Sequence, residues 1–184
     1  VRNAVASLVN HWHDTLTAGQ RTDWETYAAN TAFVNRLGDP TFLSGINQYV
    51  RSNVPRIQAL LARVDDAPAT FNTGEFTAIS IVFSEALGQL VFSFQATDAW
   101  NNEDGSALIA WSARPQNDTI NFFKGPYRKA GVILGSLALP LASPQNMVPP
   151  FLAVEDQKLF GTVRISRADG RLSVKQDFGI IALA

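Results

Sequence analysis

The hydrophobic pattern of this 184-residue chain changes its period near residue 70. Before that point apolar side chains recur every three or four residues, as in a helix, and after it they alternate with polar ones, as in a strand. The composition changes at the same place, because only three of the 12 glycines and two of the 12 phenylalanines precede it. We therefore predict an α+β chain, with a helical assembly segment over residues 1–70 and a β-sheet domain over residues 71–184.

Three short helices are expected in the first region. The first carries one apolar stripe at helical spacing, made of Val5, Leu8, Val9, Trp12 and Leu16. Thr17 and Gln20 form the capping-box pattern that begins a second helix. Residues 30–43 are predicted to be a loop. Ser44 is expected to cap a third helix, which Pro55 should end or kink because proline clashes with the preceding turn.

Short segments with strand-like alternation follow the boundary. They cover residues 76–83, 90–96, 108–113, 119–123, 127–134, 158–167, and 171–176 or beyond. The dipeptide Asp169-Gly170, between the last two, is typical of a tight hairpin. Seven or so short strands with frequent turns indicate a C-terminal antiparallel β-sandwich. The immunoglobulin disulfide is absent because the chain has no cysteine. Both a fibronectin- or immunoglobulin-like and a jelly-roll-like arrangement remain open.

The charge balance excludes several classes of partner. Lys plus Arg number 15 and Asp plus Glu number 16, so the net charge of -1 provides no basic field for nucleic acid. The longest apolar stretch, residues 131–142, is interrupted by glycine and proline and falls short of the ~20 residues of a membrane span. We expect no nucleic-acid and no membrane partner. Because the chain opens at Val1 without methionine or leader, we expect a processed or trimmed product.

Residue types used in catalysis do not occur in the combinations that a catalytic site requires. His11 and His13 are the only histidines, and two residues apart on a helix they point in different directions. No third nitrogen or sulfur ligand exists, and no serine lies in a nucleophile elbow. The spacing Gly131-x-x-x-Gly135 lacks the lysine of a phosphate loop, and we expect it to let a strand bend or approach a neighbour closely. We predict no enzyme, no cofactor and no resident metal.

One acidic loop is a candidate site. Its carboxylates and amide could bind calcium, although not at EF-hand spacing, and they are Asp98, Asn101, Glu103 and Asp104. Trp100 in the same loop could stack on a sugar or insert into a partner. The ordinary alternative is a polar hairpin whose tryptophan packs against the sheet.

Several segments resemble uncharacterised structural proteins of tailed phages and prophages. They are Trp12 to Ala28, Asn35 to Gly38, Leu43 to Asn47, Val50 to Asn53, Phe123 to Arg128 and Val163 to Arg171. These are packing and capping motifs, and they do not specify a catalytic or binding chemistry. The resemblance implies a non-enzymatic virion protein, such as a capsid decoration, head–tail or tail component. Such a protein is located in the virion and assembles with itself or with other virion proteins.

Aromatic residues and arginines dominate the energetics of protein interfaces. The candidate interface residues of these types are Trp12, Trp24, Tyr49, Arg51 and Trp100, and the apolar C-terminal tail adds Phe178, Ile180 and Ile181. Packing of the aromatics in the chain's own core is the alternative for each. Two other functions stay open, both at the bacterial surface or outside the cell. One is a carbohydrate-binding or adhesive sandwich that uses Trp100, and the other is a surface-filament subunit that donates residues 178–184 to a neighbour as a strand.

Overall fold

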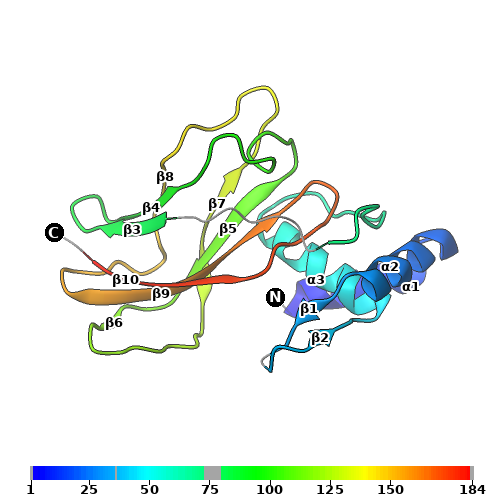
Figure 1. Cartoon of the computed structure of the whole chain (residues 1–184), viewed down its shortest axis with the longest axis horizontal. Helices are drawn as coiled ribbons and strands as arrows, with labels where there is room; N and C mark the ends of the chain where they lie inside the picture. The colour runs from blue at the N-terminus through cyan, green and yellow to red at the C-terminus, as the bar shows by residue number, and fades with distance from the viewer. Residues whose placement is uncertain (1, 36, 73–79, 183–184) are drawn as a thin grey trace. The chain divides into compact units, whose positions relative to one another are not determined.

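The computed structural model of the chain describes residues 2–35, 37–72 and 80–182 (Figure 1). That part contains three helices and ten strands, and the chain is α+β, as the change of period predicts. It divides into two compact units. The helical unit comprises Val1–Glu75 with Ser166–Val174, and the sheet unit comprises Phe76–Ile165 with Lys175–Ala184.

The helical unit contains α1 (Arg2–Asp14), α2 (Ala18–Asn30) and α3 (Gly45–Gln58). The capping box predicted for α2 is confirmed. The Gln20 amide N–H donates to Thr17 Oγ1 at 3.2 Å, and the Thr17 amide N–H donates to Gln20 Oε1 at 3.0 Å. Two amides that the helix leaves unpaired are thereby satisfied by adjacent side chains, so a local sequence pattern is enough to begin α2 at this point.

The N-terminus of α3 is capped by a side chain from α2. α3 begins directly after Ser44, as predicted, but within the described chain Ser44 makes no side-chain cap hydrogen bond. Instead the Gly45 amide N–H donates to Glu25 Oε2 at 2.8 Å. A carboxylate there satisfies an unpaired N–H and interacts favourably with the helix dipole. A Cβ at position 45 would lie 2.7 Å from Glu25 Cδ, so only glycine fits.

Pro55 is predicted to end or kink α3, and of these alternatives the ending is wrong. The proline lies inside the helix, which continues beyond it. One missing backbone hydrogen bond is outweighed by the packing of the rest of the helix. The helix ends where Leu60, with φ of 62°, donates its N–H to the Ile57 carbonyl and the next residue donates to the Arg56 carbonyl. This pair of bonds is a Schellman motif.

The helical unit has its own aromatic core. Its buried members are Leu8, Trp12, Leu16, Trp24, Tyr27 and Tyr49. The Trp24 ring centroid lies 5.8 Å from that of Tyr27 and 5.5 Å from that of Tyr49, both edge to face. The polar atoms of the rings are also paired, because Trp24 Nε1 donates to the Asp65 carbonyl at 2.8 Å and the Tyr27 hydroxyl donates to the Asn72 carbonyl at 2.6 Å. Three short helices thus gain a packed core from large side chains.

The turn predicted at Asp169-Gly170 is confirmed. The Gly170 N–H donates to the Arg167 carbonyl at 3.1 Å, and Gly170 has a φ of 93° that favours glycine. The strand predicted over residues 171–176 or beyond is confirmed only from Gln176 onward, because the described residues before it form one isolated bridge at Leu172. This hairpin belongs to the helical unit, whereas the predicted boundary places it in the sheet domain.

Two sheets build the sheet unit. One has the strand order β10-β9-β5-β7, with β6 also paired to β9, and the other has the order β3-β4-β8. The strands are β3 (Ser80–Ser84), β4 (Gln89–Ser93), β5 (Ala107–Ser112), β6 (Gln116–Asn117), β7 (Arg128–Leu134), β8 (Gln145–Met147), β9 (Gln157–Ser166) and β10 (Gln176–Ile181). The pairs β3–β4, β4–β8, β5–β7, β6–β9 and β9–β10 are antiparallel.

The strand predictions hold for the long alternating segments and fail for the short ones. Residues 119–123, all described, form no strand. Proline on both sides hides β8 from the sequence pattern, and the predicted loop 30–43 contains a short pair, β1 (Phe33–Val34) with β2 (Pro40–Thr41). Predicted strand residues 76–79 lie outside the described chain.

Both sheets contribute to one apolar core. Its largest fully buried side chains are Phe83, Leu90 and Phe92 from one sheet and Leu108, Leu159 and Ile165 from the other. The sheets approach each other where β7 lies beside β8 and where β10 lies beside β3. A Cβ on Gly131 of β7 would lie 2.7 Å from Met147 Sδ of β8. The predicted close approach at this glycine is therefore confirmed.

Candidate functional site

Four of the aromatic residues predicted to contact partners lie in the chain's own cores. Trp12, Trp24 and Tyr49 are buried in the helical unit. Trp100 is only 2% exposed, and its ring centroid lies 4.9 Å from that of Phe94 in the sheet unit. The prediction that these side chains anchor a partner is corrected accordingly, because short helices and one loop use them for internal packing and they offer no surface.

The other predicted interface residues are also engaged within the chain. The Arg51 guanidinium carbon lies 5.0 Å from the Phe33 ring centroid, and burial lowers the pKa of Arg51 below its ordinary value. Phe178 and Ile180 are half-buried against the core of the sheet unit, while Ile181 stays exposed. All of β10 is paired with β9, so most of the segment predicted as a donor strand is already a strand of its own sheet. Residues 183–184 lie outside the described chain.

The acidic loop uses its polar side chains to hold a neighbouring loop. Asn101 is fully buried. Its Nδ2 donates to the carbonyls of Ala96 and Leu141, both at 2.9 Å, and its Oδ1 accepts the Leu141 N–H at 3.2 Å. Asp104 Oδ1 accepts the N–H of Leu137 at 2.9 Å. These bonds join two loops that are distant in sequence.

The candidate calcium site is therefore corrected. Trp100 Nε1 donates to Asp98 Oδ2 at 3.3 Å, so Asp98, Asn101 and Asp104 each have a partner inside the chain, and Glu103 also interacts there. No group of three or more His, Cys, Asp or Glu side chains in the described chain is arranged to hold a metal ion. The loop's polar groups form hydrogen bonds that stabilise the backbone of this loop and of its neighbour.

The loop that Asn101 holds presents apolar side chains to solvent. We name residues 135–141 the apolar loop; in Figure 1 it leads from β7 toward β8. Its backbone is bonded to Asn101, which lies in the loop between β4 and β5. Leu137 is 69% exposed and Leu139 is 76% exposed. The backbone is fixed nonetheless, because Ser136 N–H donates to the Asn101 carbonyl at 3.0 Å. Large apolar side chains held outward on an ordered loop are typical of a contact surface.

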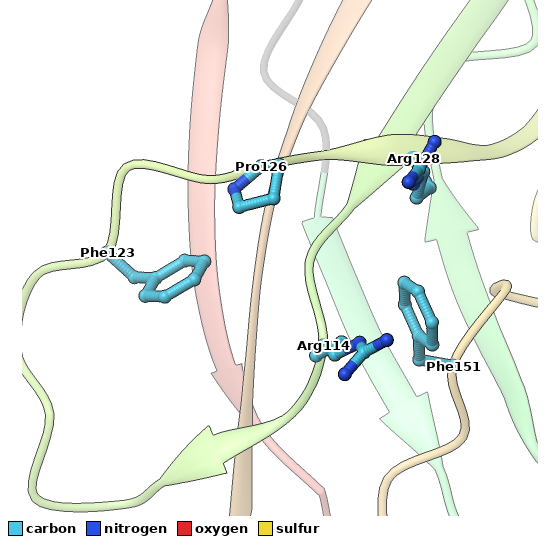
Figure 2. Close-up of a pocket in the computed structure, with 5 residues that line it drawn as sticks. All are labelled: Arg114, Phe123, Pro126, Arg128 and Phe151. Carbon is cyan, nitrogen blue, oxygen red and sulfur yellow. The ribbon is translucent and has the colours of Figure 1, made fainter.

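A pocket of about 280 Å³ lies elsewhere in the sheet unit, as Figure 2 shows. Its lining residues come from three separate places in the chain and are Arg114, Phe123, Pro126, Arg128 and Phe151. Arg114 follows β5, Arg128 begins β7, and Phe151 lies in the loop after β8. The Arg114 guanidinium carbon is 5.3 Å from the Phe151 ring centroid, a cation–π contact that orients both side chains.

The β5–β7 register explains why the two arginines meet. Arg128 pairs with Ser112, so their side chains lie on the same face of the sheet, and Arg114 follows two residues later. Ser112 is fully buried, and its hydroxyl has no hydrogen-bond partner within the described chain. None of the candidate residues chosen from the sequence lines this pocket. Its sequence signal is the segment Phe123 to Arg128, whose pattern indicates packing.

The histidines do not form a catalytic set. His11 Nε2 lies 3.3 Å from Asp65 Oδ1, a distance of ion-pair contact without a well-directed hydrogen bond, and His13 is exposed. The absence of enzymatic activity stays a prediction. No described helix has the length and apolarity to cross a bilayer.

No protein-family model, no curated protein sequence and no solved structure matches the chain. The residues and surfaces described above therefore carry the functional argument.

Proposed function

We propose that the chain is a non-enzymatic structural subunit of a tailed-phage virion, in a capsid-decoration, head–tail or tail position. It associates with copies of itself or with other virion proteins. The observation that carries the assembly function is the apolar loop, with Leu137 and Leu139 held outward by bonds from Asn101 and Asp104. The virion setting rests on the segments that resemble phage structural proteins, above all Trp12 to Ala28.

Burial of the apolar loop against a partner is favourable in free energy. Removing apolar surface from water stabilises a complex by roughly 25 cal/mol per Å². A loop that is already ordered loses little conformational entropy on binding, so more of that stabilisation appears as affinity. Only 17% of the residues are charged, which leaves few like-charge repulsions to oppose close packing of copies.

The sheet unit supports a finer fold proposal, a β-sandwich of the fibronectin or immunoglobulin kind. When the two-residue β6 is left out, the sheet unit has seven strands, and we number them in chain order from the first, β3, to the seventh, β10. In one sheet the strand order is first-second-fifth, and in the other it is seventh-sixth-third-fourth. Immunoglobulin-type sandwiches place strands A, B and E in one sheet and C, F and G in the other. This order favours that arrangement over a jelly roll, which is built from two Greek keys.

Each of the two alternative functions needs a group that the chain already uses internally. A sugar-stacking role for Trp100 requires an exposed ring, and that ring is buried against Phe94. Strand donation by the C-terminal segment requires β10 to leave β9, with which it is paired from Gln176 to Ile181. The assembly proposal needs no such rearrangement, because the apolar loop is already exposed.

Light scattering after size-exclusion chromatography, with negative-stain electron microscopy, tests the assembly function. We expect the wild type to form oligomers or a regular assembly, and the double variant Leu137→Ser with Leu139→Ser to be smaller. Leu87→Ser is the matched control, since Leu87 is also exposed in the sheet unit but lies in the β3–β4 turn. A wild type that stays monomeric at all concentrations, with no particle to bind, contradicts the proposal.

A further inference from the structure

Arg114 and Arg128 line one pocket without an acidic partner. Within the described chain, no carboxylate lies at ion-pair distance from either guanidinium, and no described lining residue is acidic. Other basic residues are paired at close range: Arg63 Nε lies 2.6 Å from Asp65 Oδ1, and Lys175 Nζ lies 2.8 Å from Asp177 Oδ2. Two positive charges in one pocket favour a bound anion.

The rest of the pocket is apolar and aromatic. In Figure 2 the Phe151 ring stands beside the Arg114 guanidinium, and Phe123 and Pro126 lie toward the other end of the pocket. Phe123 is itself supported from within the sheet unit, because its ring centroid lies 6.0 Å from that of Phe160. A flat apolar group could therefore pack between rings while an anionic group reaches the guanidinium N–H donors.

Size and chemistry narrow the ligand further. At about 280 Å³ the pocket is at the small end of ligand sites, enough for a group the size of one amino acid. An inorganic anion would leave the aromatic walls unused. A carboxylate is planar and accepts two parallel hydrogen bonds from a guanidinium, which is a more specific match than a point-like anion provides.

We propose that this pocket binds a carboxylate carried on a flat apolar group, as in an aromatic amino acid with a free carboxyl end. Arg128 and Arg114 donate to the carboxylate, and Phe123 and Phe151 pack against the apolar group. The unpartnered Ser112 hydroxyl, on the same sheet face as Arg128, is a further polar group next to this cluster. This binding site goes beyond the assembly function and does not depend on it.

Isothermal titration of the full chain with N-acetyl-L-phenylalanine tests the proposal. The matched ligand N-acetyl-L-phenylalaninamide has the same apolar group but no charge. We expect the acid to bind in the millimolar range, about tenfold or more tighter than the amide, and more weakly as salt is added. Acetate and inorganic phosphate are the further probes, and both are expected to bind more weakly than the acid.

Variants connect the affinity to the pocket. Arg128→Met and Arg114→Met should each weaken binding of the acid about tenfold, and Arg128→Lys should restore only part of it because lysine lacks the planar fork. Arg2→Met removes one charge from the exposed start of α1 and should leave the affinity unchanged. Because Arg114 and Arg128 are exposed, circular dichroism is expected to show native folding of both variants.

Three results would overturn the proposal. They are equal affinity for acid and amide, unchanged affinity in folded Arg128→Met, and phosphate or acetate binding as tightly as the aromatic acid. If Arg114→Met fails to fold, two measurements still test the proposal. One compares the affinities of the acid and the amide for the wild type, and the other uses the Arg128 variants. Loss of self-assembly in Leu137→Ser with Leu139→Ser does not affect this titration, so the two proposals fail independently.

Discussion

Arg56 Nη1 donates a 2.6 Å hydrogen bond to the carbonyl oxygen of Arg167, a residue 111 positions further along the chain. Arg56 is 3% exposed, and its Nε also donates to the Ala62 carbonyl at 2.8 Å. A buried guanidinium is tolerated because carbonyl oxygens replace the water that it loses. The arginine thereby joins α3 to both the following loop and the distant hairpin, which makes the helical unit from two separate parts of the sequence.

Replacing this arginine should destabilise the helical unit. We expect Arg56→Met to lower the free energy of unfolding by about 2–4 kcal/mol, because the carbonyls of Ala62 and Arg167 and the Ser166 hydroxyl lose their donor at once. Urea denaturation followed by circular dichroism measures the change. Arg2→Met is the control, since Arg2 is exposed, and should change stability by less than about 0.5 kcal/mol. Equal effects of the two variants would contradict the assigned role of Arg56.

The cap of α3 gives a second test. Glu25→Ala removes the acceptor of the Gly45 N–H and should cost about 1 kcal/mol, whereas Ser44→Ala should cost almost nothing. Thr17→Ala, which breaks the capping box of α2, should cost about as much as Glu25→Ala. Thermal unfolding of the three variants checks this order. A larger loss for Ser44→Ala than for Glu25→Ala would show that the cap is local after all.

These caps show which hydrogen bonds can be predicted from the sequence alone. Thr17 and Gln20 are three residues apart, so their pairing is visible in the pattern, and Asp169-Gly170 defines its turn in the same local way. Glu25 lies 20 residues before the amide that it caps. No spacing rule connects them, and the sequence therefore predicts Ser44 as the cap.

The pocket was missed for the same physical reason. Arg114 and Arg128 come together only through the register of β5 on β7, and Phe151 comes from a third segment.

For the buried aromatics the sequence identifies the residues but not their role. Composition shows that Trp24 and Tyr49 are large and apolar, but only packing decides between a core and an interface. A short-helix segment with no other large core must use them internally.

Acid should weaken the loop that follows α3. Burial alone would raise the pKa of Asp65, but the hydrogen bond and charge of Arg63, with His11, hold that pKa below its ordinary value of 3.8. A carboxyl whose pKa is lower in the folded state contributes stability above the unfolded pKa, and that contribution is lost as the pH falls through the folded pKa.

Asp65→Asn tests this linkage. At pH 7 the variant should be about 0.5–1 kcal/mol less stable than the wild type, the range of partly exposed ion pairs. The difference should shrink as the pH falls below about 4, because the wild-type carboxyl then becomes neutral as well. Urea denaturation of both proteins across that pH range measures it. A difference that stays constant with pH would mean that the charge of Asp65 does not contribute.

The end of α3 carries a residue that its backbone conformation disfavours. Leu60 has a φ of 62°, in the left-handed region, and its side chain is 90% exposed, so the leucine gains nothing from burial. Leu60→Gly should therefore raise the free energy of unfolding by about 0.5–1 kcal/mol. Asp156 has the same φ of 62° and is the matched control. Since aspartate tolerates this region better than leucine, Asp156→Gly should stabilise less. Thermal unfolding of both variants gives the comparison, and a destabilised Leu60→Gly would show that the leucine side chain packs against the chain in solution.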